Sequence, residues 1–201
     1  MPRWINVSNG FTALRVALVP FVIQAILQGR QFLALELFAA AAVTDILDGA
    51  AARRFGTVTA AGAVLDPIAD KCLLSGVFLA LAAAKAAPWW LVGVIFGRDL
   101  YILLGAAVAM RWTSLRKFPP SVWGKISTFV QVATAVSLMA RDLLGGGVAG
   151  RIATVMPWPC AAFTVWSGVH YTLRILRLRG RLTESALGSS LRLETGDHDS
   201  L

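Results

Sequence analysis

Six apolar stretches alternate with short polar or basic segments along the chain. They cover residues 12–28, 32–54, 60–84, 88–110, 123–144 and 154–176. Each is close to the roughly 20 residues that an α-helix needs to cross the hydrocarbon core of a bilayer. The pattern therefore predicts an all-α polytopic membrane protein with six transmembrane helices. Residues 1–10, which include Trp4, are expected to form a short N-terminal interfacial segment.

The composition supports a membrane protein, with 57% hydrophobic residues, 15% charged residues and a mean hydropathy of +0.67. The net charge is +8, but the basic residues lie between and after the apolar stretches. That distribution indicates membrane topology and argues against nucleic-acid binding. No small-residue cleavage site follows Arg3 and Trp4, so we expect no cleaved signal peptide. Cys72 and Cys160 both lie in apolar stretches and are predicted to be small core residues.

We expect one membrane domain, residues 1–182, followed by a disordered polar tail, residues 183–201. Basic residues gather on one side of the predicted bundle, at the N-terminus, in the loops near 53–60 and 111–125, and after the last apolar stretch. The positive-inside rule then places both termini in the cytoplasm.

Four aspartates interrupt the second and third apolar stretches, although a carboxylate at membrane depth is costly unless it is paired, hydrated or bound to a cation. Asp45 and Asp48 are three residues apart, and Asp66 and Asp70 are four apart, so each pair shares one face of a helix. Residues 54–61 can form a turn, which would make the two helices antiparallel and let the carboxylates converge. Such an oxygen-only cluster suits Mg²⁺ or Mn²⁺.

Small residues share the faces that carry these aspartates. Gly49 and Ala52 lie on the first face, and Gly62 lies one turn before Asp66 on the second. They leave space for a large ligand to approach the backbone. Arg53 follows at the rim, where a guanidinium can bind a phosphate.

The stretch from Asp45 to Asp70 resembles, position for position, the motif D-x2-D-G-x2-A-R-x8-G-x3-D-x3-D of the CDP-alcohol phosphatidyltransferases. The resemblance implies an enzyme that binds CDP-diacylglycerol and two divalent cations, transfers the phosphatidyl group to an alcohol and releases CMP. It assigns the cations to Asp45, Asp48, Asp66 and Asp70, and the proton of the acceptor hydroxyl to Asp70. It assigns the CDP-lipid to Gly49, Ala52, Arg53 and Gly62. It also implies a homodimer.

Two further patterns narrow the resemblance. Asn6, Asn9, Thr12 and Arg15 form Asn-x2-Asn-x2-Thr-x2-Arg, which resembles the start of bacterial phosphatidylglycerophosphate and cardiolipin synthases of this family. Asp-Pro-x-Ala-Asp-Lys, starting at Asp66, is similar to the same two groups. The resemblance places Asn9 and Arg15 near the lipid nucleotide and favours glycerol 3-phosphate or phosphatidylglycerol as the acceptor. An inositol phosphate acceptor or another CDP-linked donor stays open. The resemblance also implies a bacterial inner membrane, and the distribution of basic residues places the active site near the cytoplasmic face.

Arg98 and Asp99 lie near the middle of the fourth apolar stretch and leave two interpretations open. They form a structural ion pair, or Asp99 holds an arginine that binds phosphate. Lys125, at the start of the fifth stretch, either faces an acceptor phosphate or is an ordinary interfacial charge. A glycerol 3-phosphate acceptor would need cations such as Arg98, Arg116 or Lys125. Phosphatidylglycerol would instead need a lateral opening to the bilayer.

One alternative function comes from a different class. A transporter or channel could use buried carboxylates to relay protons or to bind a transported cation. Such a protein has no need of Gly49, Ala52, Arg53 and Gly62 at fixed offsets, so we favour the enzyme. Gly93-x3-Gly97 predicts a close helix contact and is the face that could serve a dimer. His170 is predicted to be a packing or interfacial residue.

Overall fold

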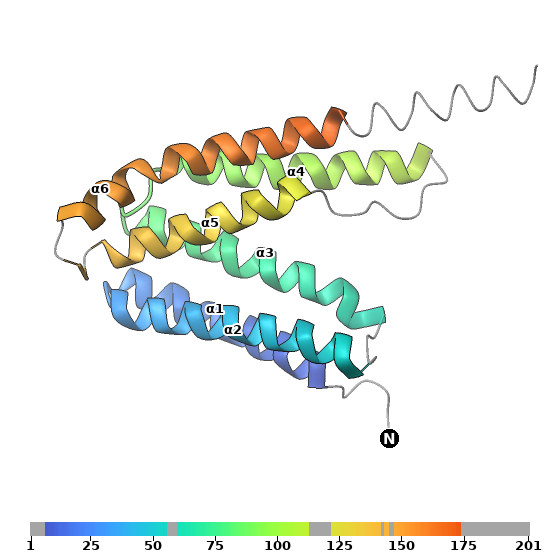
Figure 1. Ribbon diagram of the computed structural model, residues 1–201, viewed down its shortest axis with the longest axis horizontal. Coiled ribbons are helices and arrows are strands. Elements are labelled where there is room, and N and C mark those ends of the chain that lie inside the picture. Colours follow the sequence, from blue (N-terminus) through green and yellow to red (C-terminus); the bar gives the residue numbers. More distant parts are fainter. Residues whose placement is uncertain (1–6, 56–59, 113–121, 142, 145–146, 174–201) are drawn as a thin grey trace, which may run out of the picture.

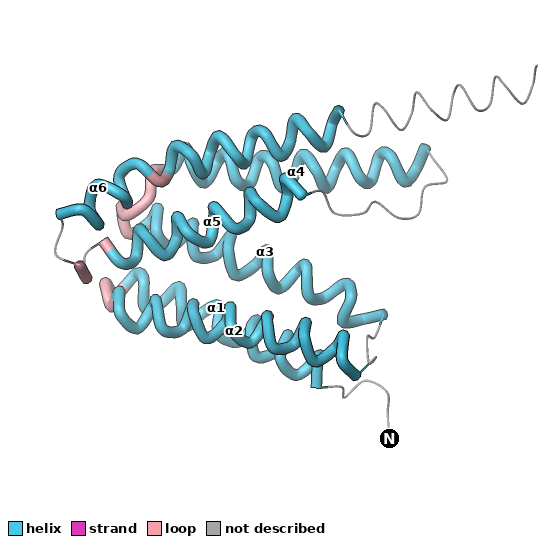
Figure 2. Tube along the Cα trace, viewed as in Figure 1, coloured by secondary structure: helices cyan, strands magenta, loops and turns pink. Residues whose placement is uncertain are grey.

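The computed structural model describes residues 7–55, 60–112, 122–141, 143–144 and 147–173, and for 7–13, 45–55, 60–68, 70 and 106–112 it describes the backbone alone. Helices and short turns account for this part of the chain, which contains no strand (Figure 2). The helices are α1 (Val7–Leu27), α2 (Gln31–Phe55), α3 (Ala60–Ala83), α4 (Trp89–Trp112), α5 (Val122–Ala140) and α6 (Gly147–Val155). After Met156 the chain is helical again over residues 157–173, here called the C-terminal helix. The predicted all-α class is confirmed.

The helix bounds agree with the predicted ones for α2, α3 and α4. α5 ends at Ala140 instead of residue 144, and the first and last helices begin earlier than predicted. The first helix begins at Val7 instead of residue 12, so the last four residues of the expected interfacial segment, 7–10, are already helical. The last helix begins at Gly147 instead of residue 154. It is interrupted only at Met156. This residue precedes Pro157, and the ring of a proline disfavours the helical conformation of the residue before it. The predicted tail, residues 183–201, lies outside the described residues.

The helices pack as two neighbouring groups (Figure 1). α1 packs against α2 and α3, while α5 contacts α2, α3 and α6, and α4 contacts α3. A single apolar cluster joins the groups, with Ile26, Phe78, Leu81, Leu91 and Met139 among its fully buried members. α5 therefore links the first three helices to the rest of the bundle.

Two tight turns close one end of the bundle. Gly29, at φ +71°, follows α1, and the amide of Arg30 donates to the carbonyl of Ala25. Lys85 adopts the same left-handed conformation after α3, and the amide of Ala86 donates to the carbonyl of Leu81. Both turns are helix caps of the Schellman type. They reverse the chain within a few residues and keep consecutive helices antiparallel.

The start of α1, the end of α2, the start of α3 and the end of α4 lie together at the opposite end of the bundle, which we call the aspartate end (Figure 1). Two helices, Val122–Ala140 and Gly147–Leu173, are long and apolar enough to cross a membrane. Shorter apolar helices cover Leu14–Leu27, Gln31–Thr44 and Lys71–Ala83. A membrane protein is thus supported, whereas the count of six spans stays a prediction.

The two cysteines differ in burial. Cys160 is buried, as predicted, but Cys72 is exposed, so its assignment to the core is wrong. Leu79, seven residues further along α3 and therefore on the same face as Cys72, is also 42% exposed, so the outward face of this helix is apolar as well. A helix facing lipid needs no polar outer face, and for this reason an apolar stretch does not reveal which side is buried.

Candidate active site

The two aspartate pairs lie on consecutive helices at one end of the bundle. Asp45 and Asp48 are in the second half of α2, and Asp66 and Asp70 are in the first half of α3. Both helices run without interruption through these positions, so each pair shares a helical face, as expected. α2 and α3 run antiparallel (Figure 1). The four carboxylates themselves lie outside the described side chains, so their convergence stays a prediction.

The connection between the two helices is shorter than predicted. α2 extends through Phe55 and α3 begins at Ala60, so only residues 56–59, which lie outside the described residues, remain of the expected turn at 54–61. The backbones of the predicted CDP-lipid residues on these helices lie near the same end: Gly49, Ala52, Arg53 and Gly62. Arg53 is in the last turn of α2, where the helix dipole favours a positive charge.

α1 brings two further predicted residues to the aspartate end. Asn9 lies in its first turn, and α1 packs against both helices that carry the aspartates. Arg15, two turns further along, is fully buried. A buried guanidinium is tolerated only where its charge is compensated. Arg15 is therefore one of the buried polar residues of the bundle, as are Gln131 and Thr164.

A divalent cation fits the donor set of the aspartate end. Carboxylates are hard oxygen ligands, and two helices that each offer two of them can surround one or two ions. Four like charges at this density also need counter-charge. Among the side chains that the structure describes, no three His, Cys, Asp or Glu residues cluster to hold a metal ion. The side chains of the four aspartates are not among them, so the cation site stays a prediction.

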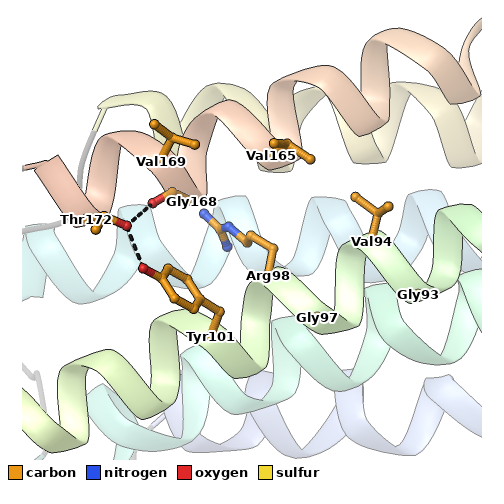
Figure 3. A pocket seen from close by; sticks show the side chains of 9 residues that line it. All are labelled: Gly93, Val94, Gly97, Arg98, Tyr101, Val165, Gly168, Val169 and Thr172. Atoms are coloured by element: carbon orange, nitrogen blue, oxygen red, sulfur yellow. Dashed lines mark hydrogen bonds between the residues drawn. The ribbon is translucent and has the colours of Figure 1, made fainter.

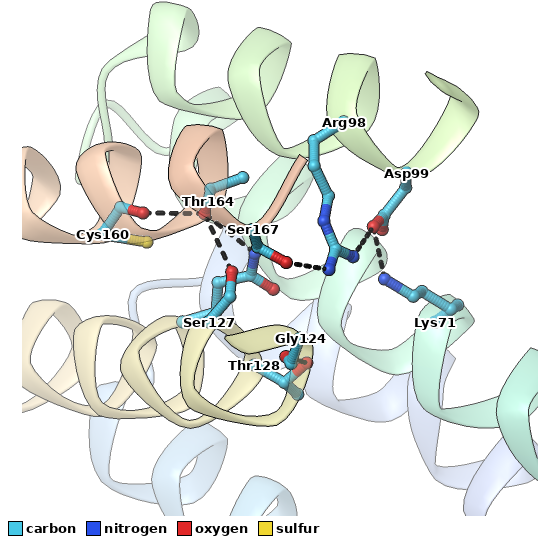
Figure 4. A network of polar contacts seen from close by, with 10 residues as sticks. Lys71, Arg98, Asp99, Gly124, Ser127, Thr128, Cys160, Thr164 and Ser167 are labelled. Carbon is cyan, nitrogen blue, oxygen red and sulfur yellow. Dashed lines mark hydrogen bonds and ion pairs between the residues drawn. The ribbon is translucent and has the colours of Figure 1, made fainter. Parts of the chain in front are cut away.

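Beside the aspartates, a charged network joins three helices. Arg98 extends from α4 toward the C-terminal helix (Figure 3). Its Nη1 donates to Oδ1 of Asp99 at 2.8 Å, and its Nη2 donates to Oγ of Ser167 at 2.7 Å. Nζ of Lys71, from α3, donates to the same Asp99 oxygen at 2.5 Å (Figure 4). One carboxylate therefore holds two cations.

The network favours neither interpretation of Arg98 and Asp99 over the other, because both require that Asp99 hold the arginine. It does add Lys71, which directly follows Asp70 in α3 and which sequence reasoning missed. Charge balance in the sequence could have indicated this role, since a lysine and an arginine at membrane depth both need a carboxylate. The contact places Arg98 beside the part of α3 that carries the predicted catalytic aspartate.

The other predicted acceptor residues are less well placed by the structure. Lys125 is exposed in the first turn of α5. Next to it, Trp123 packs edge-on against Trp166 with ring centroids 5.9 Å apart, and its ring lies 6.3 Å from that of His170. The start of α5 thus meets the C-terminal helix near Ser167, the partner of Arg98. The packing role predicted for His170 is confirmed, whereas Arg116 lies outside the described residues.

A second polar cluster connects α5 to the C-terminal helix (Figure 4). Nε2 of Gln131 donates to Oγ1 of Thr164 at 3.1 Å, and that hydroxyl donates to the carbonyl oxygen of Cys160 at 2.7 Å. Ser127 lies within 3.4 Å of the same hydroxyl. These side chains are buried. Hydrogen bonds of this kind join helices inside a bilayer, so the cluster holds the C-terminal helix, which carries Ser167, against α5.

Comparison with known proteins gives one consistent result. The model of the CDP-alcohol phosphatidyltransferase family matches residues 5–166. A probable phosphatidylglycerophosphate synthase of Mycobacterium tuberculosis is 34% identical over 92% of this chain and 88% of that protein. A CDP-diacylglycerol–glycerol-3-phosphate 3-phosphatidyltransferase of Bacillus subtilis is 31% identical over 83% of this chain and 93% of that protein. A CMP-forming cardiolipin synthase of Streptomyces coelicolor is 29% identical over 88% of this chain and 85% of that protein. These similarities support the enzyme over the transporter.

Proposed function

We infer that this chain, which belongs to the CDP-alcohol phosphatidyltransferase family, transfers the phosphatidyl group of CDP-diacylglycerol to an alcohol in phospholipid biosynthesis and releases CMP. The observation that carries this inference is the family match over residues 5–166, which includes both aspartate pairs. The names of the relatives indicate two acceptors, glycerol 3-phosphate and phosphatidylglycerol. Both offer the hydroxyl that the reaction requires.

In this proposal Asp45, Asp48, Asp66 and Asp70 hold two divalent cations, Mg²⁺ or Mn²⁺, which supply counter-charge to the diphosphate and to the departing CMP. Asp70, one helical turn beyond Asp66, accepts the proton of the acceptor hydroxyl. The oxygen then bonds to the phosphorus of the phosphatidyl group as the anhydride bond to CMP breaks. Support comes from the donor chemistry and from the unbroken helices that carry the four residues.

The CDP-lipid is expected to bind at the ends of α1, α2 and α3. Gly49, Ala52 and Gly62 leave space for the nucleotide, and Arg53 neutralises part of the diphosphate. Asn9 approaches from α1. Support comes from the packing of α1 against both motif helices.

The acceptor is expected to lie on the α4 side, near Arg98, Arg116 and Lys125. Arg98 has the strongest support, since Asp99 and Ser167 fix its guanidinium, and Lys71 connects it to α3. A phosphate at Arg98 would therefore be next to the helix that carries Asp70. Lys125 is supported by its position at the start of α5.

We further propose six membrane spans, with both termini and the aspartate end on the cytoplasmic side of a bacterial inner membrane. Arg30 and Lys85 are at the opposite end of the bundle, whereas Arg53, Arg54 and Arg111 lie at helix ends on the aspartate side. This orientation gives the site access to soluble substrates and Mg²⁺. A homodimer in the membrane completes the proposal.

The proposal is tested by CMP release from CDP-diacylglycerol in the presence of Mg²⁺. Purified protein is supplied with glycerol 3-phosphate, phosphatidylglycerol, myo-inositol 1-phosphate or serine in separate reactions. We expect release with one of the first two and its loss in Asp66→Asn. No release with any acceptor from folded protein would contradict the proposed donor.

A further inference from the structure

Arg15 of α1 is the largest of the fully buried side chains that the structure describes. A guanidinium carries its charge permanently, and taking a charge out of water is strongly unfavourable unless an opposite charge compensates it. Arg15 does have an interaction partner, so its charge is expected to be compensated within the bundle. Because no part of its surface is exposed, a substrate has no access to it in the substrate-free protein.

The helices around Arg15 limit which carboxylates can compensate it. α1 packs against α2 and α3. These two helices carry five carboxylates, which are Glu36 and the four aspartates of the aspartate end. Glu36 is exposed and lies in the first part of α2, near the opposite end of the bundle. Asp99 of α4 already holds two cations. The four aspartates are therefore the best candidates.

One contact sets the register between α1 and α3. A Cβ atom added at Gly76 would lie 2.9 Å from Cδ1 of Ile23 and 3.4 Å from Cγ1 of Val19, so Gly76 is level with these two residues. α1 and α3 run in the same direction, since α2 reverses the chain between them (Figure 1). Counting back six residues along both helices gives Asp70 on α3 and Arg15 on α1. Their backbones thus lie at about the same level of the bundle.

Arg15 also lies on the face of α1 that meets α3. Arg15, Val19 and Ile23 are spaced four residues apart and form one stripe, which the contact with Gly76 places against α3. Side chains of a helix lean toward its N-terminus, and the N-terminus of α1 is at the aspartate end. A long side chain at position 15 is therefore expected to extend from the level of Asp70 toward the start of α3.

α2 brings a further carboxylate to this level. α1 and α2 are antiparallel and meet at the tight turn at Gly29. Arg15 is 14 residues before this glycine and Asp45 is 16 residues after it. At 1.5 Å per residue their levels differ by about 3 Å. Arg15 thus lies where both helices carry an aspartate.

We propose that Arg15 is the internal counter-charge of the aspartate site and a positioning residue for the transferase reaction. Its charge offsets part of the repulsion between the carboxylates, so the site stays assembled before the cations bind. The same charge opposes the incoming cations and keeps them exchangeable. The proposal rests on the proposed cation site, and it gives Arg15 a role there without contact to either substrate.

Binding of Mn²⁺ to the purified, substrate-free full chain in detergent tests the proposal. The EPR signal of free Mn²⁺ reports the affinity. Arg15→Gln removes a positive charge beside the site and should bind Mn²⁺ about tenfold more tightly. Arg15→Lys keeps the charge and should bind as the wild type does. Arg30→Gln, which removes an exposed arginine at the opposite end, is the matched control and should also leave the affinity unchanged.

The sign of this effect separates the proposal from a purely structural role. A site that is only distorted binds the cation more weakly, so unchanged or weaker Mn²⁺ binding by folded Arg15→Gln would overturn the proposal. A wild-type protein that binds no Mn²⁺ would contradict the cation site itself. Unfolding by SDS in EDTA, which depends on no cation, then decides the role of Arg15.

In that cation-free titration Arg15→Gln should lower the unfolding midpoint. Asp70→Asn removes one of the repelling carboxylates, and it should raise the midpoint more in Arg15→Gln than in the wild type, recovering about half of the loss. If Arg15→Gln alone does not fold, the double variant should. Glu36→Gln, added in place of Asp70→Asn, should recover nothing. The absence of recovery with Asp70→Asn, or an equal recovery with Glu36→Gln, would show that Arg15 does not compensate the aspartates.

Discussion

Replacing Asp99 with asparagine tests whether one carboxylate holds the charged network together. Its Oδ1 accepts from Lys71 at 2.5 Å and from Arg98 at 2.8 Å. The Lys71 side chain is 46% exposed and that of Arg98 only 12%, so the bond to Arg98 should carry most of the energy. Hydrogen bonds to charged groups contribute about 1.5–3 kcal/mol, and exposed ion pairs about 0.2–1 kcal/mol. Since asparagine keeps an oxygen acceptor but loses the charge, we expect the free energy of unfolding to fall by about 2 kcal/mol.

Unfolding is followed by tryptophan fluorescence during titration of mixed micelles with SDS. Glu36→Gln, which removes an exposed carboxylate from α2, is the control and should leave the midpoint unchanged. In the enzyme assay, Asp99→Asn should raise the KM for the acceptor more than the KM for CDP-diacylglycerol, because Arg98 is proposed to face the acceptor. Equal midpoints for the two variants would refute the energetic argument. If Lys71→Gln destabilises the protein more than Asp99→Asn does, the conclusion that the less exposed Arg98 carries most of the energy is wrong.

Three further perturbations test the catalytic site and the packing. Asp70→Asn should retain CDP-lipid binding, measured by calorimetry, and lose nearly all turnover; an equal loss of both would make Asp70 a metal ligand only. EDTA should abolish CMP release and Mg²⁺ or Mn²⁺ should restore it, so full activity in metal-free buffer would contradict the cation site. Gly76→Leu should destabilise the fold by about 1–3 kcal/mol through overpacking, since a Cβ there would lie 2.9 Å from Cδ1 of Ile23. Adding Ile23→Ala should recover part of that loss in the same SDS titration, and no recovery would place the strain elsewhere.

The apolar pattern predicts the helices well because it depends on local composition and length. It locates the part of each helix that suits hydrocarbon, and α2, α3 and α4 begin and end within a residue or two of the predicted bounds. It fails where helical hydrogen bonding continues into polar residues. α6 shows this, since it is helical through Gly150 and Arg151 before the apolar stretch begins.

The aspartate register could also be predicted, because spacings of three and four residues define a helical face without any tertiary information. The role of Lys71 could not. Its partner Asp99 is 28 residues away on another helix. Which charges meet depends on how α3 packs against α4, and local periodicity contains no information on that packing. The polar cluster around Thr164 escaped prediction for the same reason.

In a membrane protein the core and the lipid are both apolar, so an apolar residue gives no indication of the side that it faces. Cys72 is predicted to lie in the core and is exposed. A Cβ atom added at Gly93 or Gly97 would meet nothing within 4 Å among the described residues, so the helix contact predicted there, which a second copy could supply, stays a prediction. Charge is different, because neither environment tolerates it unpaired. Lys71 and Arg98 share the carboxylate of Asp99, so a charge pattern in the sequence predicts that such residues find partners, although it does not predict which residues meet.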